Sequence, residues 1–154
     1  MYKRQGLQTL DLSSITVVGR RSEALQGFIT DLQQGHAPLT GCLDNAVQLN
    51  ESVAQAALVV NTTPVGMAQH DDPRAMPLGA ELWSGVNGEA VLYDLIYTPR
   101  PTSWLAAGQQ RGHRCIDGLE MLVQQGAASL RLWSGRNEVP VEAMRSAAAT
   151  ALAA

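Results

Sequence analysis

The stretch Ala90-Val91-Leu92-Tyr93-Asp94-Leu95-Ile96-Tyr97 decides the fold class of this chain. Its apolar and aromatic residues predict a strong strand. Thr102 follows as a helix cap, and the sequence predicts a helix from there to Gln110, which Gly112 stops. A strand followed so closely by a helix is typical of a parallel sheet covered by helices.

The same alternation of strand and helix continues on both sides of this stretch. Further strands are predicted at Ile15–Val18, Cys42–Leu43, Ala57–Asn61 and His113–Ile116. Further helices are predicted at Ala24–Gln33 after a Ser22 cap, at Glu51–Ala56, at Gly118–Trp133, and at Asn137–Thr150 with Pro140 in its first turn. We therefore expect an α/β fold, a Rossmann-like parallel sheet with helices on both faces.

Composition limits the classes of function. The 154 residues are 45% hydrophobic and 16% charged, as expected for a globular domain. The net charge of −3 gives no basic surface for nucleic acid, and no apolar run approaches the roughly 20 residues that cross a membrane. Cys42 and Cys115 are too few for a disulfide framework, which favours the cytoplasm.

The N-terminal residues predict an incomplete domain. Residues 1–5 resemble a translated sequencing-adapter scar, the alternative being an ordinary polar N-terminus. None of the 14 glycines forms a G-x-G-x-x-G phosphate loop, and residues 6–14 leave room only for the end of one helix. A βαβ unit needs roughly 30 residues. We therefore expect residues 6–154 to be an NADP-binding domain with C-terminal helices, truncated at its N-terminal edge.

The end of the first predicted strand bears on the choice of cofactor. In dinucleotide-binding folds, a carboxylate after the second strand binds the ribose 2′-hydroxyl of NAD. Here Arg20 and Arg21 follow the strand, and no carboxylate occurs before Glu23. Arginine forks match phosphate oxygens, so this turn favours NADP if the strand is the second one. The alternative is a solvated arginine pair in a loop.

The segment Asn61–Met67 directly follows another predicted strand. Its polar side chains and backbone amides would line a cofactor cleft, which makes Asn61 and Thr62 candidate cofactor contacts; the alternative is a plain turn. Asp94 and Tyr97 end the next predicted strand, and Tyr97 alone could be a half-buried core residue. Metal and nucleophilic sites are not predicted, because the histidines lack ligand spacing and G-x-S-x-G does not occur.

Taken together, these blocks resemble the shikimate dehydrogenase family. The resemblance covers about residues 7–150 and rests on Asn61–Met67, Asp94–Pro99 with Thr102 and Leu105, Gly108 and Gly112, Asp117–Gln125 and Trp133–Gly135. Arg20 also matches, whereas Gly19 and Arg21 depart from the usual Asn-Arg-Thr.

The resemblance implies NADP-dependent reduction of 3-dehydroshikimate to shikimate, by a monomer or homodimer. It also implies a catalytic Lys–Asp pair in an N-terminal substrate domain; Lys3 is the only lysine here, so no catalytic residue is assigned. By resemblance, substrate contacts fall on Tyr97 and Gln125. Cofactor contacts fall on Gly19, Arg20, Arg21, Ser22, Glu23, Ala24, Leu95, Gly118 and Met121.

Helical spacing places Gly118, Met121 and Gln125 on one face, while Leu119, Leu122, Val123 and Leu130 would face a core. Two alternatives remain open. One is a quinate/shikimate dehydrogenase with relaxed cofactor choice, and the other is a non-catalytic fragment of a dinucleotide-binding fold.

Overall fold

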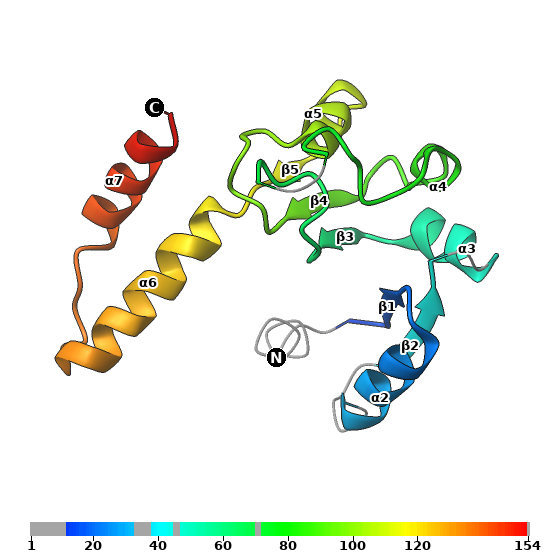
Figure 1. Ribbon diagram of the computed structural model, residues 1–154, viewed down its shortest axis with the longest axis horizontal. Helices are drawn as coiled ribbons and strands as arrows, with labels where there is room; N and C mark the ends of the chain where they lie inside the picture. Colours follow the sequence, from blue (N-terminus) through cyan, green and yellow to red (C-terminus); the bar gives the residue numbers. More distant parts are fainter. Residues whose placement is uncertain (1–11, 33–37, 45–46, 70–71, 154) are drawn as a thin grey trace. The chain divides into compact units, whose positions relative to one another are not determined.

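The computed structural model describes residues 12–32, 38–44, 47–69 and 72–153 (Figure 1). They form two compact units, which divide between Gln55 and Ala56 and are described separately below. In both units, every strand pairing between described residues is parallel, which confirms the α/β class. The interpretation of residues 1–5 as a scar lies outside the described residues.

The described part of the first unit contains two strands, β1 (Ile15–Gly19) and β2 (Leu39–Leu43), which pair in register from Ile15 opposite Leu39. Helix α2 (Ser22–Leu32) packs closely on β2, because a Cβ added to Gly41 would lie 3.1 Å from a side-chain carbon of Ile29. Helix α3 (Gln48–Gln55) completes this unit. Among the residues of this unit that the structure describes, the buried apolar side chains are Ile29, Cys42, Leu49 and Val53.

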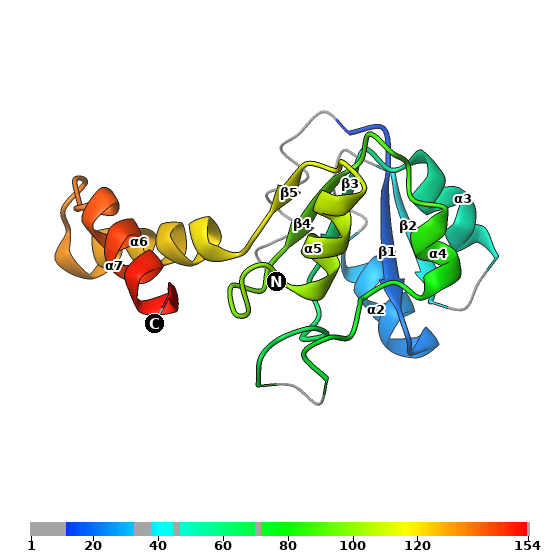
Figure 2. The same ribbon diagram turned by 90° about the horizontal axis from the view of Figure 1, so that it is seen from above.

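The described residues of the second unit contain three strands in the order β3 (Leu58–Asn61), β4 (Val91–Asp94) and β5 (Cys115–Ile116). Asn61 lies opposite Asp94, so β3 and β4 end at the same level of the sheet. Helix α5 (Ser103–Gln110) lies against β4 and β5 (Figure 2). The approach is close, since a Cβ on Gly108 would lie 2.4 Å from Leu92 Cδ1.

The remaining helices of the second unit are α4 (Ala80–Ser84), α6 (Leu119–Ser134) and α7 (Val141–Ala153). Helices α6 and α7 run side by side as a hairpin (Figure 1), and Gly135 ends α6 with a φ of 65°. Arg145 of α7 joins Glu120 of α6 through a Nε–Oε2 hydrogen bond of 2.7 Å. No helix among the described residues is long and apolar enough to cross a membrane.

Several predicted boundaries were wrong. The strand expected at Ala90–Tyr97 ends at Asp94, because the Asp94 side chain accepts the Ile96 N–H and turns the backbone out of the sheet. The last helix begins at Val141 rather than at Asn137, and the Pro140 carbonyl accepts the Met144 N–H at its start. The short helix α4 was not predicted.

Candidate functional site

A buried polar network joins the ends of β3 and β4. Asp94, fully buried, accepts hydrogen bonds from Asn61 Nδ2 at 3.0 Å and from Thr102 Oγ1 at 2.8 Å. The Ile96 N–H donates to the same carboxylate at 3.1 Å. Burial raises the pKa of Asp94, and hydrogen bonds from Ile96, Thr102 and Asn61 oppose that shift.

Asn61, predicted to contact cofactor, has its side chain occupied within the chain. Only 3% of the residue is exposed, and Nδ2 also donates to the Val65 carbonyl at 3.2 Å. Oδ1 accepts from the Thr63 N–H at 3.0 Å and from the Thr63 hydroxyl at 2.7 Å. Asn61 therefore shapes the loop that follows β3, whereas its neighbour Thr62 is exposed on that loop.

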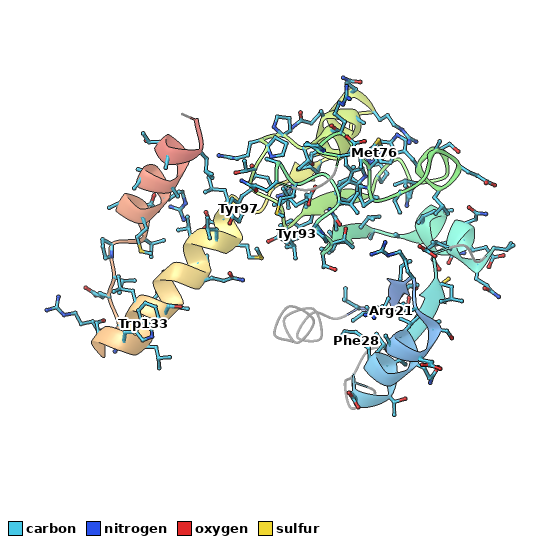
Figure 3. All side chains as sticks on the ribbon, viewed as in Figure 1. Arg21, Phe28, Met76, Tyr93, Tyr97 and Trp133 are labelled. Atoms are coloured by element: carbon cyan, nitrogen blue, oxygen red, sulfur yellow. The ribbon has the colours of Figure 1, made fainter. Side chains whose placement is uncertain are left out.

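Backbone contacts tie the loop after β3 to the loop after β4. The Leu95 N–H donates to the Asn61 carbonyl at 3.1 Å, and the Ala68 N–H donates to the Thr98 carbonyl at 3.0 Å. Tyr97, which Figure 3 labels on the second loop, is 39% exposed. These contacts bring Asn61, Thr62, Leu95 and Tyr97 to one end of the second unit's sheet.

The start of α6 is fixed against the same loop. The Gly118 N–H donates to the Ile96 carbonyl at 3.0 Å. A Cβ on Gly118 would lie 2.1 Å from the Leu95 carbonyl oxygen, a distance that real Cβ atoms essentially never show. The chain's own backbone therefore requires glycine here, in addition to the predicted approach of a cofactor.

An ion pair beside Gly118 was not predicted. Arg100 Nε lies 2.6 Å from Asp117 Oδ2, and Asp117 Oδ1 accepts the Leu119 N–H at 3.1 Å. Asp117 thus connects the loop after β4 to the first turn of α6. Burial raises the pKa of nearby Tyr93, and the charges of Asp117 and Glu120 add to that shift. The sequence marks Asp117 only as an acidic residue just before a helix, and it carries no signal for the pairing with Arg100.

Helix α6 presents the other predicted site residues. Met121 is half-buried and Gln125 is exposed. Leu119, Val123 and Ala127 form the buried face, so the prediction of a core side was right for Leu119 and Val123. The same prediction was wrong for two residues, since Leu122 and Leu130 are only half-buried.

The arginine pair belongs to the first unit, at the carboxyl end of β1. Arg20 and Arg21 are exposed, and Figure 3 shows Arg21 where β1 meets α2. Neither arginine forms an ion pair with any residue that the structure describes. Ser22, Glu23 and Ala24 are exposed in the first turn of α2, and Gly19 ends β1 half-buried.

The described residues contain no group of three His, Cys, Asp or Glu side chains that could hold a metal ion. His113 is buried, with Nδ1 3.1 Å from the Ala90 carbonyl, and His36 and His70 lie outside the described residues. A hollow of about 380 Å³ between α5, β5 and α7 includes none of the predicted site residues.

The chain is similar to proteins of known families. The family model of the shikimate 5′-dehydrogenase C-terminal domain matches residues 118–149. A shikimate dehydrogenase (NADP(+)) of Synechocystis sp. is 44% identical over 142 residues, which cover 92% of this chain and 48% of the relative. The corresponding protein of Prochlorococcus marinus strain MIT 9515 is 39% identical over 93% of this chain and 50% of its own length.

Over nearly its whole length, the chain is thus similar to shikimate dehydrogenases. It spans about half the length of the curated relatives it matches. The resemblance expected from Asn61–Met67, Asp94–Pro99 and Asp117–Gln125 is thereby confirmed.

Solved structures of this family have the same fold. Shikimate 5-dehydrogenase of Thermus thermophilus, solved with NADP(H) and shikimate, superposes with a TM-score of 0.74 at 32% identity, covering 95% of this chain and 49% of that one. The Mycobacterium tuberculosis shikimate dehydrogenase gives a TM-score of 0.72 at 30% identity, over 94% of this chain and 51% of that one. The predicted Rossmann-like class is confirmed.

Proposed function

We propose that this chain is the NADP-binding part of a shikimate dehydrogenase, which reversibly reduces 3-dehydroshikimate to shikimate. The observation that carries the proposal is the 44% identity to a shikimate dehydrogenase (NADP(+)) over 92% of the chain. That span includes both the arginine pair and the site at the end of β3 and β4. We place the enzyme in the cytoplasm, which its two free cysteines favour, as a monomer or homodimer.

The arginine pair fits the 2′-phosphate of NADP. Both guanidinium groups are exposed at the carboxyl end of β1, where doubly wound sheets bind their ligands. They have no carboxylate partner among the described residues, so they remain available to a phosphate. Ser22 at the start of α2 adds a hydroxyl donor, and Gly19, Glu23 and Ala24 surround the same turn.

The second unit supplies the remaining contacts in this proposal. Thr62, Leu95 and Met121 would hold the cofactor, which would supply the hydride when bound. Tyr97 and Gln125 hold the substrate hydroxyls, since a phenol and an amide both donate and accept hydrogen bonds. The proton-transfer pair comes from the half of the relatives that this chain does not span.

Cofactor binding by the 154-residue chain tests the role of the arginines. Each hydrogen bond to a charged group contributes about 1.5–3 kcal/mol, so Arg20→Ala with Arg21→Ala should weaken NADP⁺ binding by about tenfold or more. NAD⁺ binding should stay the same, because NAD⁺ lacks the 2′-phosphate. Arg136→Ala, at an exposed arginine between α6 and α7, is the matched control. Equal losses for both cofactors would show that the pair does not contact the 2′-phosphate.

Activity is tested by joining this chain to the N-terminal half of the Synechocystis relative. The joined enzyme should reduce NADP⁺ when shikimate is added, while the chain alone should give no turnover. Misplacing a reactant by about 1 Å can already cost a hundredfold in rate. A joined enzyme that is folded by circular dichroism but inactive with shikimate would contradict the proposal, and turnover with quinate would favour the quinate/shikimate alternative.

A further inference from the structure

Asp94 accepts hydrogen bonds from three segments of the second unit. It is the last residue of β4, and none of its surface is exposed. Its three donors come from the end of β3, from its own following loop and from the cap of α5: Asn61, Ile96 and Thr102. The carboxylate therefore holds segments that are far apart in the sequence.

The direction of each hydrogen bond in this network follows from the carboxylate. An ionised carboxylate only accepts hydrogen bonds. The amide nitrogen of Asn61 must therefore face it, and the Thr102 hydroxyl must donate a hydrogen bond to it. The Thr102 oxygen can then accept the Leu105 N–H, at 3.3 Å, which caps α5. No ion pair between described residues involves Asp94, so neutral donors alone satisfy it.

We propose that Asp94 is a positioning residue that holds the loops 62–67 and 95–98 in the arrangement that binds cofactor and substrate. It orders the first loop through Asn61, whose oxygen accepts both donors of Thr63. It orders the second loop directly, by accepting the Ile96 N–H. The identity of the ligands rests on the proposed function, but the ordering is a property of the free chain and can be measured without ligand.

Amide hydrogen exchange in the isotope-labelled 154-residue chain measures this ordering. The N–H groups of Thr63, Val65 and Ile96 donate to side chains of the network and report on the two loops. The Val91 N–H donates to the Ala57 carbonyl inside the sheet and reports on the core. The ratio of loop exchange to core exchange separates loosened loops from a destabilised fold.

The main variant is Asp94→Leu, which keeps the branching of the side chain but removes both acceptor oxygens. The loop amides should exchange about tenfold faster, or more, relative to Val91. Asp94→Asn keeps one oxygen for Asn61 and Ile96, so its loop amides should stay within about threefold of the wild type. Leu92→Ala, fully buried on the same strand, is the control that lowers stability without touching the network, and its ratio should not change.

Either of two results would overturn the proposal: an unchanged ratio in Asp94→Leu, or an equal change in Leu92→Ala. Should Asp94→Leu not fold, Asn61→Leu decides. It should speed exchange at Thr63 and Val65 by about tenfold and leave Ile96 within about threefold, since Asp94 still accepts its N–H. Faster exchange at Ile96 as well would show that Asp94 does not hold the second loop.

Adding NADP⁺ to the same samples separates this inference from the proposed function. In the wild type, NADP⁺ should shift the amide resonances of Thr62 and Leu95. If it shifts neither resonance while Asp94→Leu still loosens the loops, the cofactor assignment fails and the positioning role stands. If NADP⁺ shifts both resonances equally in the wild type and in Asp94→Leu, and binds both proteins with the same affinity, the loop ordering by Asp94 does not serve cofactor binding.

Discussion

Replacing Gly118 by alanine tests how the start of α6 is held. The added Cβ would lie 2.1 Å from the Leu95 carbonyl oxygen, 2.6 Å from the Leu95 carbonyl carbon and 3.0 Å from the Ile96 carbonyl carbon. All three are backbone atoms, so no side-chain rotation can relieve the contact. The φ of −77° at Gly118 is ordinary for any residue, so the clash alone would produce the effect.

Overpacking of this kind typically costs about 1–3 kcal/mol, and we expect at least about 2 kcal/mol here because the backbone must move. Urea unfolding of the 154-residue chain measures that loss. Gly126→Ala is the matched control on the same helix, since its Cβ would meet only the flexible end of Met144, at 3.1 Å. Alanine also favours helix over glycine by about 1 kcal/mol, so this control should be neutral or stabilising. An unchanged unfolding midpoint in Gly118→Ala would refute the steric argument and leave only the approach of a cofactor as the reason for glycine.

Two further predictions concern α6. Gln125→Ala should weaken shikimate binding by about ten- to a hundredfold in the joined enzyme and leave the melting temperature unchanged, because Gln125 is exposed; a large fall in melting temperature would make it a structural amide instead. Hydrogen bonds from Arg145 lower the pKa of Glu120 from its ordinary 4.5 to about 2. The stability that this pair gives the hairpin is therefore complete above about pH 4.5 and is lost as the pH falls towards 2. Thermal unfolding between these pH values should show a loss that Glu120→Gln reduces, and an identical acid dependence in that variant would contradict the assignment.

Local patterns predicted those elements that depend on neighbouring residues. The Thr102 cap was predicted because a threonine before a helix accepts an N–H three residues later, and the structure has that bond from Leu105. The apolar run predicts a strand at Ala90–Tyr97, and the structure has one at Val91–Asp94. Periodicity predicts a helix at Gly118–Trp133, and the structure has one at Leu119–Ser134. The parallel pairing followed from the alternation of these elements.

Contacts between distant residues decided what the sequence could not predict. The sequence predicts that the strand at Ala90 continues to Tyr97, because Ile96 and Tyr97 are good strand formers. The turn after Asp94 depends on a carboxylate that is also held by Asn61, 33 residues away. The Arg100–Asp117 pair likewise joins residues 17 apart, and neither residue carries a local signal for the other.

Stability and site geometry are coupled in the second unit but separate in the first. Asp94 and Gly118 act on the same short backbone stretch, since Asp94 accepts the Ile96 N–H and Gly118 donates to the Ile96 carbonyl. A substitution that shifts the loop after β4 must therefore also disturb buried hydrogen bonds. Arg20 and Arg21 are exposed, without ion pairs among the described residues, so they can change with little effect on folding. Under the proposed function, preference for the 2′-phosphate would therefore be a property that substitution of this arginine pair can alter freely, whereas the loops at Asn61 and Leu95 are constrained by the fold of the second unit.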